Sequence, residues 1–223
     1  MSMQQHLMMG KTAACPELEG TLWTWGENSS GFLGHDDTTK RSSPTQVGSG
    51  TNWTNKVSPN GTAAIMLIKS DGTLWAWGTN NFGQSGLGDT TARSSPVQVG
   101  SDTDWAFCTT TGSSAYAIKT DGTLYSCGYN NYGQLGHNDA TDRSTLAQVG
   151  SLTDWASVSS FPWQHVLFLK TDGTLWGVGY NNVGQLGNGA SGEIQSSPVQ
   201  VGSETHWIAF DAGAEASRAL ASV

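Results

Sequence analysis

The sequence predicts an all-β fold from three observations: abundant glycine, abundant tryptophan and an internal repeat of about fifty residues. The 223 residues include 29 glycines and 10 tryptophans, and only 13% are charged. Glycine and β-branched residues form helices poorly, whereas aromatic and β-branched residues suit strands. With 36% apolar residues, the chain is long enough to bury one sizeable core. We therefore expect many short strands joined by turns.

The internal repeat is most visible in one glycine-rich stretch that occurs four times. The copies are GTLWTWGENSSGFLG from Gly20, GTLWAWGTNNFGQSG from Gly72, GTLYSCGYNNYGQLG from Gly122 and GTLWGVGYNNVGQLG from Gly173. Their starting points are 52, 50 and 51 residues apart. This constant period indicates tandem copies of one structural unit.

Each unit predicts four short strands. Downstream of the shared stretch, Gln-Val-Gly recurs in every unit, and a tryptophan lies five residues after its glycine. An apolar run then closes the unit, as in HVLFLK from His165. Four extended segments separated by Gly, Asn, Asp and Pro are typical of a β-propeller blade. The recurring tryptophans are Trp53, Trp105, Trp155 and Trp207.

The recurring tryptophans and glycines have a structural interpretation. One blade cannot cover both of its faces, so neighbouring units must pack together. Burying on the order of 200 Å² per tryptophan would contribute roughly 5 kcal/mol for each one. An acidic residue followed by glycine between two extended segments is expected to form a hairpin turn, with glycine at positive φ. These turn pairs are Asp71 with Gly72, Asp121 with Gly122, and Asp172 with Gly173.

The repeat also predicts the domain organisation. Residues 1–19 lie outside the repeat, and the four units are 20–71, 72–121, 122–172 and 173–223, which together form one propeller domain over 20–223. Three arrangements stay open: a closed four-bladed ring, an open arc completed by another copy or another protein, and a fragment of a longer propeller. The last unit stops where the next DGTLW would begin, which slightly favours closure of the ring by strands from both ends of the chain.

Three motifs carry a resemblance to a known family. The succession of G-T-L-x-x-x-G, x-N-x-x-G-Q-L-G and P-x-Q-V over residues 20–223 resembles the regulator of chromosome condensation repeat family. The resemblance implies a β-propeller, most often with seven blades, that serves mainly as a protein-interaction platform. The near-identical, tryptophan-rich, short-looped units are similar to those of bacterial and bacteriophage proteins, which implies a surface- or virion-associated structural role.

The net charge and the hydropathy of the sequence limit which classes of partner and which cellular locations are expected. The net charge is −8 and no run of Lys or Arg occurs, so nucleic acid is not an expected partner. The N-terminus lacks the apolar core of a signal peptide, and no stretch approaches the roughly 18 apolar residues of a membrane span. A cytoplasmic or virion-associated location is compatible with these features. A protein partner is expected, with a glycan as an alternative, and a homo-oligomer is expected if one chain does not close the ring.

No catalytic, cofactor or metal site is expected. The histidines are scattered over different repeat positions, and no Ser/His/Asp or Cys/His arrangement stands out. His35 and His137 stand beside acidic residues, but the other two units have Leu87 and Asn188 at that position. A variable loop explains this better than a metal site does. We therefore expect a protein that is not an enzyme.

The loops after the GTLW strands hold the candidate binding residues. If the blades are equivalent, asparagines and aromatic residues from these loops gather on one rim, where they could bind a glycan or a peptide. The candidates are Asn81, Phe82, Tyr129, Asn131, Tyr132, Tyr180 and Asn182. In the alternative interpretation, the asparagines hold turn conformations and the aromatic rings cap the blade edges.

Three functions follow. The first is a non-enzymatic interaction or structural module, and the second is a lectin-like binder that uses the rim. The third, regulation of a GTPase, is implied only by the family and is the weakest, because no unit carries an insertion long enough to form a wedge. Light sensing, which the plant ultraviolet-B photoreceptor of this family performs with a GWRHW motif, is not expected because that motif is absent.

Overall fold

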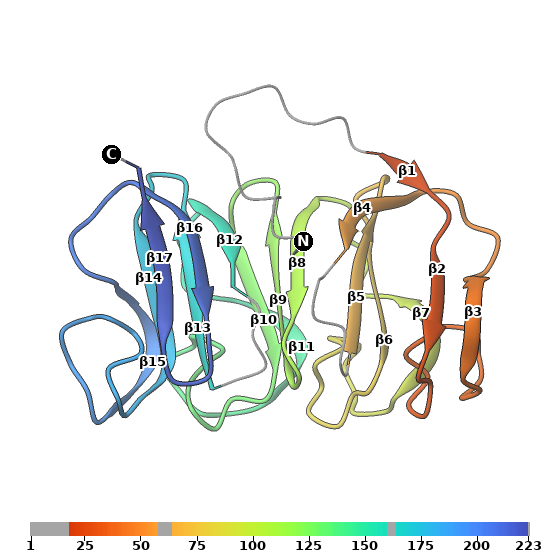
Figure 1. Ribbon diagram of the computed structural model, residues 1–223, viewed down its shortest axis with the longest axis horizontal. Helices are drawn as coiled ribbons and strands as arrows, with labels where there is room; N and C mark the ends of the chain where they lie inside the picture. The colour runs from red at the N-terminus through yellow and green to blue at the C-terminus, as the bar shows by residue number, and fades with distance from the viewer. Residues whose placement is uncertain (1–17, 58–63, 160–163, 223) are drawn as a thin grey trace.

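The computed structural model describes residues 18–57, 64–159 and 164–222, and within these ranges every regular element is a β-strand (Figure 1). The all-β class expected from composition is therefore confirmed. No helix in these ranges could cross a lipid bilayer.

Three complete blades form the middle of the molecule, each an antiparallel sheet in which strands consecutive in the chain are neighbours. The first blade contains β4 (Trp53–Val57), β5 (Ala64–Lys69), β6 (Leu74–Gly78) and β7 (Arg93–Gln98), with the short β1 (Glu19–Gly20) beside β4. The second contains β8 (Trp105–Thr110), β9 (Ser114–Lys119), β10 (Leu124–Gly128) and β11 (Arg143–Gln148). The third contains β12 (Trp155–Val158), β13 (His165–Lys170), β14 (Leu175–Asn181) and β15 (Glu193–Gln200).

Two half-blades lie at opposite ends of the molecule (Figure 1). The N-terminal half-blade pairs β2 (Trp23–Gly26) with β3 (Arg41–Gln46), which correspond to the third and fourth strands of a blade. The C-terminal half-blade pairs β16 (Trp207–Ala212) with β17 (Ser217–Ala221), which correspond to the first and second strands. The two pairs are separate sheets, so the described residues form an open arc of blades and not a closed ring.

The blades are out of phase with the sequence units. In the first blade, β4 and β5 come from residues 20–71, whereas β6 and β7 come from 72–121. At each junction the backbone N–H of the recurring tryptophan donates to a glycine carbonyl at the start of the same unit. These pairs are Trp105 with Gly72, Trp155 with Gly122 and Trp207 with Gly173, at 3.2, 3.1 and 3.1 Å. Each repeat thereby ties one blade to the next.

The recurring tryptophans lie in the cores between blades. Trp53, Trp105 and Trp155 are buried, and each packs edge to face against an aromatic residue of the third strand of its own blade. Trp207, in the C-terminal half-blade, is only partly buried because no third strand among the described residues covers it. This packing accounts for the recurrence of tryptophan without a ligand.

The acidic-glycine pairs form tight turns. Gly122 has a φ of +81°, and a Cβ there would overlap the backbone carbonyl oxygen of Thr153. The preceding Asp121 accepts hydrogen bonds from the backbone N–H and the hydroxyl of Thr123 at 2.9 and 2.7 Å. The hydroxyl bond, followed by the backbone one, lowers the pKa of the Asp121 carboxyl. The same geometry recurs at Gly72 and Gly173, so these carboxylates cap turns within the fold.

Candidate functional site

The loop that leaves the third strand of each blade is organised by one buried asparagine. In the first complete blade, Asn80 Oδ1 accepts from the backbone N–H of Ser85 at 2.9 Å. Its Nδ2 donates to the carbonyl oxygens of Asp89 and Thr91 at 2.9 and 3.2 Å. Asn28 and Asn130 repeat this pattern, and Asn181 retains most of it. We call this side chain the hub asparagine.

The hub asparagine was not among the residues singled out from the sequence. The predicted binding residues are the second asparagine of each pair, and the side chains of Asn81, Asn131 and Asn182 are exposed. One signal distinguishes the two positions: the hub asparagine occurs in all four units, whereas Ser29 takes the second position in the first unit. The fold therefore depends on the first asparagine and leaves the second available to solvent.

The aromatic candidates come together in one row. The ring centroids of Phe82 and Tyr129 are 4.9 Å apart, those of Tyr129 and Tyr132 are 6.2 Å apart, and those of Tyr132 and Tyr180 are 5.3 Å apart. Each pair meets edge to face, the arrangement that aromatic quadrupoles prefer. We call these four side chains the aromatic rim. The rim spans three successive blades, and the exposed Val183 occupies the Tyr132 position of the third complete blade.

The aromatic rim ends at the N-terminal half-blade. In the first unit, Glu27 stands at the position of Tyr129 and Ser30 at that of Tyr132. Glu27 instead forms an exposed ion pair with Lys40 at 2.7 Å. The loop keeps its hub asparagine there, so the fold does not require aromatic side chains at these positions.

His35 and His137, which stand beside acidic residues in the sequence, each contact a hydroxyl within their own repeat. Nε2 of His35 lies 3.0 Å from the hydroxyl of Thr24, and Nε2 of His137 lies 2.9 Å from that of Ser126. Burial, ahead of neighbouring arginines, lowers the pKa of both imidazoles. Within the described ranges, no three His, Cys, Asp or Glu side chains are grouped in a way that could hold a metal ion.

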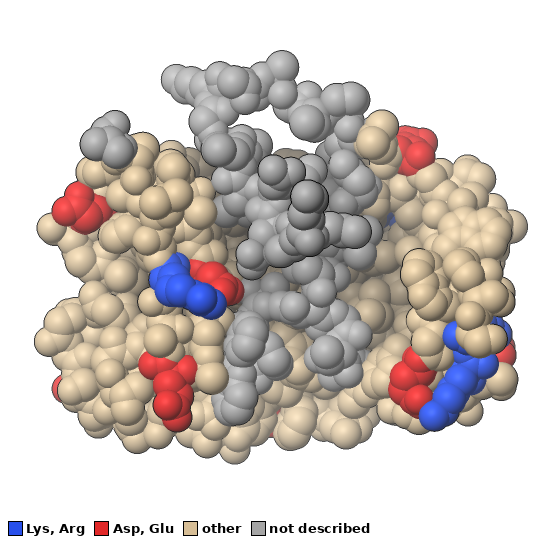
Figure 2. Space-filling model, viewed as in Figure 1, with Lys and Arg blue, Asp and Glu red and all other residues tan. Residues whose placement is uncertain are grey.

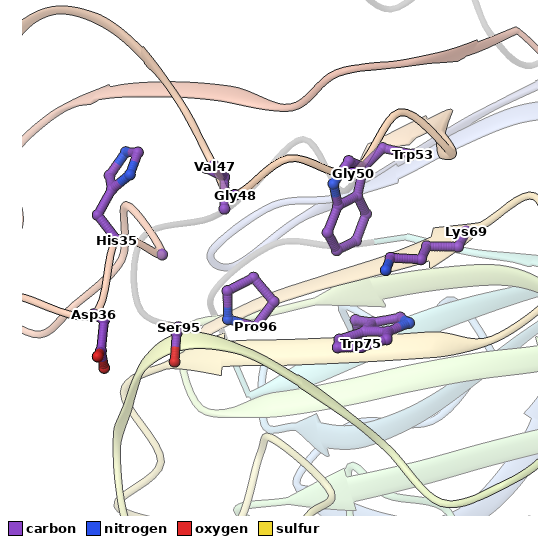
Figure 3. Close-up of a pocket in the computed structure, with 11 residues that line it drawn as sticks. His35, Asp36, Val47, Gly48, Gly50, Trp53, Lys69, Trp75, Ser95 and Pro96 are labelled. Carbon is purple, nitrogen blue, oxygen red and sulfur yellow. The ribbon is translucent and has the colours of Figure 1, made fainter.

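A cavity of about 380 Å³ lies between the N-terminal half-blade and the first complete blade (Figure 3). We call it the first inter-blade cavity. Trp53, Lys69 and Trp75 form one side of it, and Ser95 and Pro96 of β7 form another. The loop residues His35, Asp36, Val47, Gly48 and Gly50 close it from the half-blade. No residue of this cavity except the structural Trp53 was singled out as a site from the sequence.

Charged side chains are sparse around these features. On the face shown in Figure 2, the basic side chains lie beside acidic ones and form no basic patch. Three of the ion pairs follow one repeated loop position and join Asp37 to Arg41, Asp89 to Arg93 and Asp139 to Arg143 at 2.9, 2.6 and 2.8 Å. In each pair the aspartate also accepts a hydrogen bond from the hub asparagine of its loop, so the ion pair and the asparagine hold the same loop.

Comparison with known proteins agrees with the motifs and the fold. The model of the regulator of chromosome condensation (RCC1) repeat matches residues 19–58, 71–108, 121–160 and 172–220. The ultraviolet-B receptor UVR8 of Arabidopsis thaliana is 33% identical over 188 residues, which are 82% of this chain and 42% of the receptor.

Solved structures show the same fold. The crystal structure of human WBSCR16 matches with a TM-score of 0.75 at 21% identity, over 91% of this chain and 53% of that one. Prp20p of Saccharomyces cerevisiae matches with a TM-score of 0.75 at 18% identity, over 90% of this chain and 51% of that one. The chain thus spans about half the length of these proteins.

The three proteins named here are eukaryotic, so the similarity to bacterial and bacteriophage proteins stays a prediction. The match to the repeat model covers more than half of the residues and includes all four sequence units. The chain therefore belongs to the regulator of chromosome condensation (RCC1) repeat family.

Proposed function

We propose that this chain is a non-enzymatic protein-interaction module and that the aromatic rim contacts its protein partner. The observation that carries the proposal is the unbroken row of Phe82, Tyr129, Tyr132 and Tyr180 across the loops of three blades. Aromatic side chains are enriched in protein interfaces and provide many of the residues on which affinity depends. Rings held against one another also lose little conformational freedom when they bind.

Variation within the chain supports a binding role for the rim. The unit position of Phe82 holds Ser30, Tyr132 and Val183 in the other three units, while the hub asparagine stays the same. A position that the fold leaves free can be used for recognition, and loops on a rigid scaffold commonly carry that role. The rim combines such free positions with an ordered aromatic surface.

The family supports the same class of function. Prp20p, whose structure shares the fold, is described by its binding to Gsp1p and histones. Regulation of a GTPase is the weaker, family-based alternative for this chain. Measurement of nucleotide release from candidate GTPases tests it, and release rates that do not change in the presence of the chain would remove it.

The principal experiment uses a displayed peptide library selected on the immobilised chain. The rim variant carries Phe82→Ser and Tyr132→Ser, which introduce the residue that the first unit has at this position, Ser30. Peptides that need the rim should bind this variant at least tenfold more weakly, because a contact residue on which affinity depends contributes about 2 kcal/mol or more.

The matched control is Leu152→Ser. Leu152 is 44% exposed and Phe82 is 39% exposed, so the control removes an apolar side chain outside the rim that is about as exposed as Phe82. Binding to the control should equal binding to the unmodified chain. Selected peptides that bind the rim variant as tightly as the unmodified chain would exclude the rim as the interaction site.

A lectin-like function is the second candidate, because exposed asparagines stand beside the rings. Asn182 Nδ2 donates to the hydroxyl of Tyr180 at 2.6 Å, and Asn81 and Asn131 are exposed at the equivalent positions. A glycan array tests this candidate. Saturable binding that Asn131→Ala and Tyr132→Ala abolish would favour a lectin, and an array without signal would eliminate it.

A further inference from the structure

Each complete blade holds a lysine against two aromatic rings. The ammonium of Lys69 lies 3.9 Å from the ring centroid of Trp75 and 4.8 Å from that of Trp53. Lys119 and Lys170 lie 4.4 to 5.4 Å from the equivalent rings of their blades. A cation near two aromatic faces is attracted to both rings, so each ammonium is held in place.

In two of the three blades, this lysine also has a carboxylate partner. Lys119 Nζ lies 2.9 Å from Asp102 and 3.1 Å from Asp104, and Lys170 Nζ lies 3.2 Å from Asp154. Asp104 and Asp154 immediately precede the recurring tryptophan of their blade, and Asp102 stands two residues earlier. The second and third blades therefore complete their lysine sites with acidic side chains from the chain itself.

The first blade lacks those acidic side chains. Gly50 stands at the position of Asp102, and Asn52 stands at the position of Asp104. Among the described residues, Lys69 has its two indole rings and no carboxylate within ion-pair distance. The lysine therefore has an ion-pair partner in the second and third blades, whereas in the first blade Lys69 has no ion-pair partner at those positions and interacts with Asp71 from a greater distance.

The first inter-blade cavity opens at this place. Figure 3 shows the Lys69 amine between Trp53 and Trp75, with its nitrogen directed into the cavity. Gly50 lies on the wall beside Trp53, and Asp36 lies at the far side from Lys69. The volume of about 380 Å³ leaves room for a side chain to reach the ammonium.

We propose that the first inter-blade cavity binds the carboxylate of an aspartate or glutamate side chain of a protein partner, with Lys69 as its ion-pair donor and Trp53 and Trp75 as its apolar walls. The partner's carboxylate takes the place that Asp102 and Asp104 hold in the next blade. The net charge of −8 opposes an acidic partner only weakly, because salt screens charges more than about 8 Å away. This site is separate from the aromatic rim, and it stands if the rim fails its test.

The test uses blocked peptides that carry one side-chain carboxylate and no terminal charge. Acetyl-Gly-Asp-Gly-amide and acetyl-Gly-Glu-Gly-amide are titrated into the chain while the indole N–H signals of Trp53 and Trp75 are followed by NMR. The isosteric acetyl-Gly-Asn-Gly-amide is the neutral control. The acidic peptides should shift both indole signals saturably and bind at least tenfold more tightly than the control, because a hydrogen bond to a charged group has that strength.

Two variants identify the site. Gly50→Asp gives Lys69 an internal carboxylate, and Gly50 accepts a side chain because its φ is ordinary and a Cβ there lies 3.6 Å from its nearest neighbours. Lys69→Met removes the cation. Both variants should lose binding of the acidic peptides, whereas the matched control Lys119→Met, in a blade that supplies its own carboxylates, should retain it.

The proposal is overturned by any of three results. The first is the absence of saturable indole shifts with the acidic peptides. The second is binding of the neutral Asn peptide with the same affinity. The third is undiminished binding to a folded Gly50→Asp variant, because in that protein the ammonium is already paired.

Discussion

Trp25 and Trp77 occupy the same position in successive repeats, yet Trp25 is 59% exposed and Trp77 is fully buried. Trp77 lies in β6 beside β5, and its Nε1 donates to the carbonyl of Phe32 at 2.8 Å. Trp25 lies in β2, which has β3 on one side and no strand on the other within the described ranges. Leu220 of β17 is 60% exposed in the same way, whereas Ile68 at the equivalent place in β5 is 1% exposed.

These two edges predict self-association. Strand edges with apolar side chains pair readily with other strands, and β17 of one copy has the repeat register to pair with β2 of another. The Ile68–Leu74 register of β5 and β6 would place Leu220 opposite Leu22. Light scattering should therefore give a mass of at least twice 23.5 kDa, and Leu220→Lys should lower it. A mass of 23.5 kDa at every concentration would contradict this prediction.

The hub asparagine predicts a sharp contrast between adjacent residues. Asn80→Ala removes three hydrogen bonds to buried or partly buried backbone groups and should lower the free energy of unfolding by about 2–4 kcal/mol. Asn81→Ala changes an exposed side chain and should alter it by less than about 0.5 kcal/mol. Urea unfolding followed by tryptophan fluorescence measures both. Equal effects would show that the hydrogen bonds of Asn80 do not stabilise the loop.

The turn glycines predict a second contrast. Gly122→Ala forces a Cβ into the carbonyl of Thr153 at a φ of +81° and should cost about 3 kcal/mol or more. Gly100 has a φ of +64° with open space around it, so Gly100→Ala should cost only about 1 kcal/mol. Thermal unfolding of the two variants separates two costs. Gly122→Ala reports the steric overlap together with the backbone strain, and Gly100→Ala reports the backbone strain alone. A smaller loss for Gly122→Ala than for Gly100→Ala would contradict this account.

His165 predicts how stability depends on pH. Burial lowers the pKa of His165 to about 4, and its Nε2 lies 3.0 Å from the hydroxyl of Ser217. Between about pH 6.5 and pH 4 the unfolded chain therefore binds a proton here and the folded chain does not. The stabilisation is complete above pH 6.5 and falls by about 3 kcal/mol as the pH decreases to 4.

The matched variant is His165→Ser, because Ser114 occupies this position in the second blade. Unfolding measured between pH 7 and pH 4 should be much less pH-dependent in this variant. At lower pH both proteins should lose further stability, because a hydrogen bond from Arg41, followed by one from the backbone of Thr39, lowers the pKa of Asp37 to about 2. An unchanged slope between pH 6.5 and 4 in the variant would show that His165 is not its source.

The sequence was sufficient for the features that depend on composition and period. The strand content, the four units and the tryptophan positions follow from residue types that recur at a fixed spacing. The gathering of Phe82, Tyr129, Tyr132 and Tyr180 was also anticipated, because equivalent loops of stacked blades meet on one side. A periodic pattern has no preferred starting point, however, so it does not indicate which strands of neighbouring repeats share one sheet.

The first inter-blade cavity could not be predicted from the sequence, for a different reason. Its walls include Gly50 in one loop, Lys69 at the end of a strand and Pro96 in another strand, and only the fold brings these together. The signal that could have indicated it is a departure from the repeat: the first unit lacks the acidic residues that precede Trp105.

The offset between repeats and sheets also bears on how such a chain can change in length. A complete sheet takes two strands from one repeat and two from the next, so a duplicated repeat would supply the missing halves of both neighbouring sheets. Its strands would pair on both sides with partners already in the correct register. Recombination between repeats can therefore add or remove one blade at a time while every blade core stays intact, and the same property makes the chain suitable for building propellers of chosen size.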